Sequence, residues 1–67
     1  MRVLIAGFGR VGSRTARVLD EEGHDVTVIE NDTEKVELAE SRGFTVVAGD
    51  ASNTSVLEEA GVDGLVP

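Results

Sequence analysis

The sequence of 67 residues contains no cysteine, no tryptophan and no tyrosine, and it has only two phenylalanines and one proline. Without cysteine, the chain has neither a disulfide framework nor a thiolate metal site to stabilise it. A chain of this length buries only about 60% of the surface that its unfolded form exposes, so its core is small. Because aromatic side chains are so few, we expect that core to be aliphatic.

Basic residues are also scarce, with 6 lysines and arginines against 13 acidic residues and a formal net charge of −7. A surface of this sign repels nucleic acids and anionic membranes, so we expect neither as a partner. No apolar run approaches the roughly 20 residues that cross a bilayer, and no basic, cleavable leader precedes the first apolar segment. The sequence therefore predicts a cytoplasmic protein that does not insert into a membrane.

Short apolar runs and segments of helical period alternate along the chain. Residues 3–6, 26–29 and 44–48 are apolar and rich in β-branched side chains, which is typical of buried strands. Helices are predicted from residue 10 to the glycine at 23, from an N-cap at Asp32 or Thr33 to the glycine at 43, and over residues 54–60. In the first helix, the apolar spacing assigns to one face Val11, Thr15, Val18 and Leu19.

The order β-α-β-α-β-α predicts an α/β fold, namely the first half of a Rossmann-like, doubly wound parallel sheet with helices on both faces. Right-handed crossovers place the first strand centrally, the second beside it and the third outermost. Residues 1–67 then form the N-terminal half of one domain. Three strands leave one edge of the first strand unpaired, and an open edge recruits another strand, so we also predict a homo-oligomer.

Three glycines, at positions 7, 9 and 12, follow the first predicted strand and open the first predicted helix. In a dinucleotide-binding loop, the first glycine makes the tight turn, the second lets the backbone approach the pyrophosphate, and the third lets the helix pack on the strand. The helix N-terminus then presents N–H groups and partial positive charge to the phosphates. A turn that merely needs glycine is the alternative, but the β-α-β context favours nucleotide binding.

An acidic residue, Glu30, ends the second predicted strand, where a carboxylate can accept hydrogen bonds from an adenosine ribose. A carboxylate repels a 2′-phosphate, and the neighbours Asn31 and Asp32 supply no cation. The site should therefore prefer NAD or another adenine nucleotide over NADP. The alternative is an ordinary solvated acid at a strand end.

Arginines follow the glycine loop into the first predicted helix. Arg10 lies at the start of the helix, where it can reach a phosphate as a charge-assisted donor. Arg14 and Arg17 continue the same face and fit a solvated stripe better than a ligand contact.

Three stretches of the sequence, GFGRVG at 7–12, GHDVTVIEND at 23–32 and VVAGDAS at 46–52, resemble the nucleotide-binding regulatory domain of potassium transport systems. That family includes the TrkA and KtrA proteins and the RCK domains of potassium channels, and its domain continues through three more strands. The resemblance implies that Arg10 approaches the phosphates and that Glu30 holds the ribose. It also implies that the adenine end is lined by Asn31, Asp32, Asp50 and Ala51.

The position of Asp50 agrees with this assignment, because ligands of doubly wound sheets bind at the carboxyl ends of the strands. An N-cap of the third helix is a second, compatible role for its carboxylate. The complete candidate cofactor site comprises Gly7, Phe8, Gly9, Arg10, Val11, Gly12, Glu30, Asn31, Asp32, Asp50 and Ala51.

The resemblance implies a regulatory module that binds NAD+ or NADH, or alternatively ATP or ADP, beside a membrane subunit of a potassium transporter or channel. Such a module does no chemistry. The alternative is the cofactor-binding fragment of an NAD-dependent dehydrogenase. Such an enzyme needs a catalytic acid or base and a substrate pocket, which usually come from a later domain. The only histidine, His24, falls in a turn at the opposite end of the predicted sheet, and the sequence has no catalytic set and no metal-ligand spacing.

Overall fold

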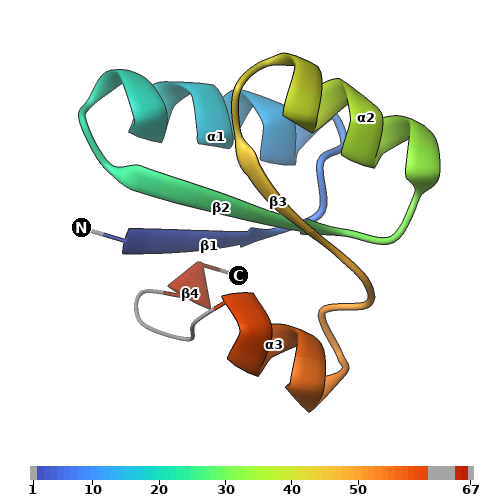
Figure 1. Cartoon of the computed structure of the whole chain (residues 1–67). Coiled ribbons are helices and arrows are strands. Elements are labelled where there is room, and N and C mark those ends of the chain that lie inside the picture. Colours follow the sequence, from blue (N-terminus) through green and yellow to red (C-terminus); the bar gives the residue numbers. More distant parts are fainter. Residues whose placement is uncertain (1, 61–64, 67) are drawn as a thin grey trace.

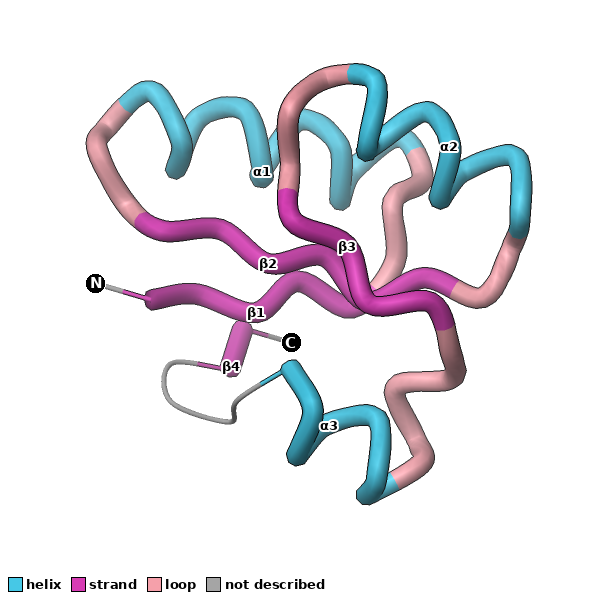
Figure 2. Tube along the Cα trace, in the orientation of Figure 1, coloured by secondary structure: helices cyan, strands magenta, loops and turns pink. Residues whose placement is uncertain are grey.

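The computed structural model describes residues 2–60 and 65–66 of the chain. Strands and helices alternate along them, in the order β1 (Arg2–Ala6), α1 (Arg10–Glu21), β2 (Asp25–Glu30), α2 (Thr33–Ser41), β3 (Thr45–Ala48), α3 (Thr54–Ala60) and β4 (Leu65–Val66). The strands form one parallel sheet with the order β3-β2-β1-β4. Helices α1 and α2 cover one face of this sheet and α3 lies on the other (Figures 1 and 2). The predicted Rossmann-like α/β fold is confirmed.

Strand β4 corrects one expectation from the sequence. The edge of β1 that three strands would leave open is paired in parallel with β4, where Leu4 is opposite Leu65 and Ile5 is opposite Val66. A two-residue strand covers only part of that edge. The free edge of β1 that could recruit another strand is therefore shorter than the sequence indicated.

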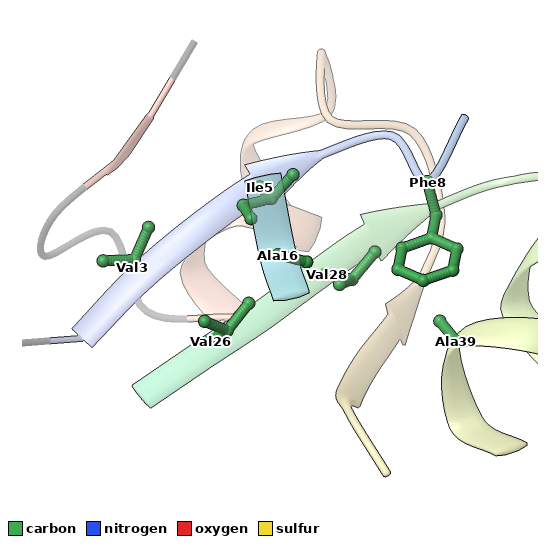
Figure 3. Packing of buried hydrophobic residues seen from close by; sticks show 7 residues of the cluster. All are labelled: Val3, Ile5, Phe8, Ala16, Val26, Val28 and Ala39. Atoms are coloured by element: carbon green, nitrogen blue, oxygen red, sulfur yellow. The ribbon is translucent and has the colours of Figure 1, made fainter. Parts of the chain in front are cut away.

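The hydrophobic core is divided between the two faces of the sheet, because successive strand residues point to opposite sides. Between the sheet and α1 and α2 lies a cluster that includes Phe8 of the β1–α1 loop; its buried members are Val3, Ile5, Phe8, Ala16, Val26, Val28 and Ala39 (Figure 3). On the other face Leu4 and Ile29 pack with Val56 of α3. Apart from Phe8 and the partly buried Phe44 that packs against it, the core is aliphatic, as the composition predicted.

The buried face of α1 differs from the predicted one. Val11 is 77% exposed and Val18 is 45% exposed, whereas Ala16 is fully buried and Leu19 is partly buried against the core. The reason is Gly12: a Cβ at this position would collide with the carbonyl oxygen of Gly7. The helix approaches the sheet most closely along its small residues, and this rotates the valines away from the core.

No helix within residues 2–60 is long and apolar enough to cross a bilayer.

Candidate functional site

The loops that follow β1, β2 and β3 meet at the carboxyl ends of the strands, on the right in Figure 1. Between them lies a hollow of about 240 Å³, lined by Ala6, Gly7, Ile29, Glu30, Asn31, Gly49, Asp50 and Ala51. The structure therefore brings together, from three separate loops, five residues of the predicted site, namely Gly7, Glu30, Asn31, Asp50 and Ala51. This is the position at which doubly wound sheets bind their ligands.

The glycine loop has the geometry that a close backbone approach requires. Gly7 has φ of +96°, in the left-handed region that disfavours a side chain. A Cβ on Gly9 would meet no atom within 4 Å, so the space above this backbone is open. Gly9 precedes α1 without a side-chain cap, and the first helical bond is made by the N–H of Ser13 to the carbonyl of Gly9, at 2.9 Å. The earlier N–H groups of the helix are therefore oriented toward this open space.

Glu30 is only 7% exposed, and it is the most heavily hydrogen-bonded side chain of the site. Its Oε1 accepts a bond of 2.6 Å from the backbone N–H of Phe8. Its Oε2 accepts bonds of 3.0 Å and 2.9 Å from the N–H groups of Asn31 and Asp32. The solvated strand-end acid that the sequence left as an alternative is thus wrong, because this carboxylate is buried and bound to two loops.

These contacts keep Glu30 ionised. Burial alone would raise the pKa of Glu30, but the N–H groups of Asp32, Phe8 and Asn31, aided by the positive charge of Lys35, lower the pKa below its ordinary value. An ionised carboxylate accepts about four hydrogen bonds. Three are in place, one on Oε1 and two on Oε2, so Oε1 has capacity for one further donor.

Phe8 enters the site through its backbone alone. Its side chain is 2% exposed and points from the loop into the core toward Ala39 (Figure 3). The ring packs edge-on against Phe44, with 5.7 Å between centroids, and the guanidinium of Arg42 lies 5.8 Å from its centre. In this conformation the ring anchors the loop, and only the main chain of Phe8 faces the region where a ligand would lie.

The side chain of Arg10 is exposed on α1, next to the glycine loop. A second shallow hollow of about 240 Å³ lies beside α1, where the residue that ends α2 also reaches it, and is lined by Arg10, Ser13, Arg14, Arg17 and Arg42. The sequence spacing groups Arg10, Arg14 and Arg17 but not Arg42, which follows α2 and is brought to this surface only by the fold. Val11, exposed beside Arg10, is also outside the core. Ligand contacts by Arg10 and Val11 remain predictions.

The two acidic loop residues have separate local partners. The carboxylate of Asp32 accepts a bond of 3.0 Å from the N–H of Glu34 and caps α2, as predicted. Asp50 is exposed, and its Oδ1 accepts the N–H and the hydroxyl of Ser52, both at 2.9 Å, which lowers the pKa of Asp50. Asp50 does not cap α3, because Asn53 accepts the first-turn N–H of Ser55, at 2.9 Å.

The other chemical features are sparse. Residues 2–60 contain no group of three or more histidine and acidic side chains that could hold a metal ion. His24 precedes β2, at the end of the sheet opposite the hollow. The described loops thus offer hydrogen-bond donors and acceptors suited to binding, and no acid–base pair beside the hollow.

Comparison with known proteins places these features in a family. The profile of the TrkA-N domain matches residues 3–65. The chain is 43% identical over 63 residues to the Trk system potassium uptake protein TrkA homolog of Pyrococcus abyssi, covering 92% of this chain and 28% of that protein. It is 41% identical over 61 residues to the glutathione-regulated potassium-efflux system protein KefC of Cronobacter sakazakii, covering 91% of this chain and 10% of that protein.

Two solved structures share the fold. The TrkA-N domain of the inner membrane protein ybaL of Escherichia coli has a TM-score of 0.85 and 30% identity, over 96% of this chain and 47% of that one. The NAD(P)-binding domain of an exopolyphosphatase-related protein of Archaeoglobus fulgidus has a TM-score of 0.83 and 27% identity, over 94% and 47%. The chain therefore spans about half of these solved structures, and only 28% and 10% of the length of the two potassium-transport relatives.

Proposed function

Because this chain belongs to the TrkA-N domain family, we propose that it binds an adenine nucleotide, NAD+ or NADH in the first place and ATP or ADP as alternatives, and that it acts as a regulatory module of a potassium transport system. The observation that carries this proposal is the buried, ionised Glu30 beside the glycine loop. The loop suits phosphates and the carboxylate suits a ribose hydroxyl.

The placement of a nucleotide follows from the chemistry of the loops. The phosphates lie over Gly9 at the N-terminus of α1, within reach of Arg10. The ribose lies against Glu30, and the adenine lies in the hollow toward Asp50 and Ala51. Because the carboxylate of Glu30 is negative, a 2′-phosphate at the same position is repelled, and NADP binds more weakly than NAD.

The regulatory role is supported by the relatives, which are named as components of potassium uptake and potassium efflux systems. Nucleotide binding shifts the equilibrium of such a module between two conformations for which the nucleotide has different affinity. The module acts on a membrane subunit of the transporter or channel, at the inner face of the cell membrane. The homo-oligomer expected from the sequence stays a prediction, because β4 pairs part of the strand edge on which it rested. In the alternative, a cofactor-binding fragment of an NAD-dependent dehydrogenase, the catalytic acid or base comes from another domain, because His24 precedes β2 at the end of the sheet opposite the hollow. The names of the relatives favour the regulatory module.

The test is calorimetric titration with NAD+, NADH, NADP+, ATP and ADP. A Gly9→Ala variant is the sharpest probe, because a Cβ there contacts nothing in the protein and would occupy the space assigned to the pyrophosphate. We expect the variant to fold normally and to bind nucleotide at least about tenfold more weakly. Ser55→Ala, on α3 at the other face of the sheet, is the control. Normal binding by Gly9→Ala, or no binding by the unsubstituted chain, contradicts the proposal.

A further inference from the structure

We propose that Glu30 is a positioning residue for the phosphate-binding loop, in addition to its role toward the ribose. The inference rests on the proposed function, because it concerns how the same nucleotide site is built. The same carboxylate then has two roles, one toward the ribose and one toward the glycine loop. As a ribose ligand, Glu30 acts only on nucleotides that carry a ribose; as a positioning residue, it also acts on the phosphates.

Three loops converge on Glu30. Its Oε1 holds the N–H of Phe8 in the β1–α1 loop, across a separation of 22 residues. Its Oε2 holds the N–H groups of Asn31 and Asp32 in the β2–α2 loop. Its backbone carbonyl accepts a bond of 2.9 Å from the N–H of Gly49, at the end of β3. One residue thus joins all three walls of the hollow.

The glycine loop needs such an anchor. Gly7 and Gly9 flank Phe8 and carry no side chain, so their backbone has many accessible conformations that binding would have to restrict. The ring of Phe8 is fixed in the core, and its N–H is fixed by the carboxylate. Together these two attachments hold the residue between the glycines from opposite sides. The loop is therefore arranged for phosphates before any ligand arrives.

Charge provides a way to distinguish the two roles. Glu30 is negative and lies close to the expected phosphates, so neutralising it reduces electrostatic repulsion toward an anion. If Glu30 were only a ribose ligand, Glu30→Gln would bind inorganic pyrophosphate as well as the parent chain or more tightly. If Glu30 positions the loop, the same substitution weakens pyrophosphate binding, although the removal of a negative charge alone would strengthen it.

Glu30→Asp separates the long-range bond from the local ones. An aspartate keeps the charge but is shorter by one methylene, about 1.5 Å, and so withdraws from the N–H of Phe8. The neighbouring N–H groups of Asn31 and Asp32 stay within local reach. A loss of pyrophosphate affinity in Glu30→Asp therefore reports the loss of the hydrogen bond between Glu30 and the glycine loop.

The experiment is an NMR titration of the parent chain, Glu30→Gln and Glu30→Asp with pyrophosphate, adenosine and ADP, together with amide exchange at Phe8. Asp25→Asn, which removes one charge at the opposite end of β2, is the matched control. We expect both Glu30 variants to bind pyrophosphate about tenfold or more weakly and to exchange the Phe8 amide faster than neighbouring core amides. The control should match the parent chain.

The outcomes separate the two hypotheses. If the parent chain binds ADP and pyrophosphate while Glu30→Asp keeps full affinity for pyrophosphate and slow exchange at Phe8, the positioning role is overturned and the proposed function stands. If the parent chain responds to no ligand, the proposed function fails. Unchanged exchange at Phe8 in the variants would then overturn the positioning role as well.

Discussion

Glu30 gives the stability of the chain a defined dependence on pH. Its pKa is lowered in the folded protein from an ordinary value of 4.5, so the unfolded chain binds its proton more tightly. The stabilisation is therefore fully present above the unfolded pKa and is lost as the pH falls through the folded value. We expect the free energy of unfolding to decrease on acidification below about pH 5, and the decrease to be smaller in Glu30→Gln. Urea unfolding between pH 3 and pH 7 measures it. If the free energy of unfolding falls equally below about pH 5 in the two proteins, the Glu30 carboxylate does not cause the decrease.

Substitution of Arg10 and of Arg14 shows which charge at the start of α1 contacts the nucleotide. Both are exposed and line the same shallow hollow, but only Arg10 adjoins the glycine loop. We expect Arg10→Ala to cost about 1.5–3 kcal/mol of binding free energy, the range for a hydrogen bond to a charged group. Arg14→Ala removes the same charge one turn further along the helix and should have a much smaller effect. Equal losses measured by titration calorimetry would indicate a general electrostatic effect instead of a contact.

At the level of elements, the close approach of α1 to the sheet depends on Gly12. A Cβ there meets the carbonyl of Gly7, which is backbone and cannot move aside cheaply. We expect Gly12→Ala to reduce the free energy of unfolding by about 1–3 kcal/mol. Gly9→Ala, with open space and an extended backbone, should leave stability unchanged or raise it by about 0.4–1 kcal/mol. Denaturant unfolding of the two variants gives the comparison, and equal stabilities would contradict the packing that we assign to Gly12.

Elements with a strong local signal could be predicted from the sequence, and contacts between distant residues could not. The apolar runs of β1, β2 and β3 are local patterns, and the structure confirms these strands. The glycine spacing is also local, and the structure places it in a tight turn between β1 and α1, with a positive φ at Gly7. The predicted face of α1 is right for Leu19, which packs against the core, and wrong for Val11 and Val18. The valines are larger than Gly12 and Ala16, while close packing selects the smaller residues. Strand β4 has two residues, too few to show a period. The bond from Phe8 to Glu30 joins positions 22 apart, and no spacing rule predicts it.

The whole molecule combines a small core with a net charge of −7. The described sheet ends in two short edges, β3 of four residues and β4 of two. Short edge strands recruit other strands weakly, so self-association has to overcome charge repulsion with limited backbone pairing. Salt screens that repulsion over about 10 Å at 0.1 M, and we therefore expect association to increase with ionic strength. Sedimentation of the chain at low and high salt measures this. A monomer of unchanged size across the salt range, with one cooperative thermal transition, would show that the core divided between the two sheet faces is sufficient without a partner.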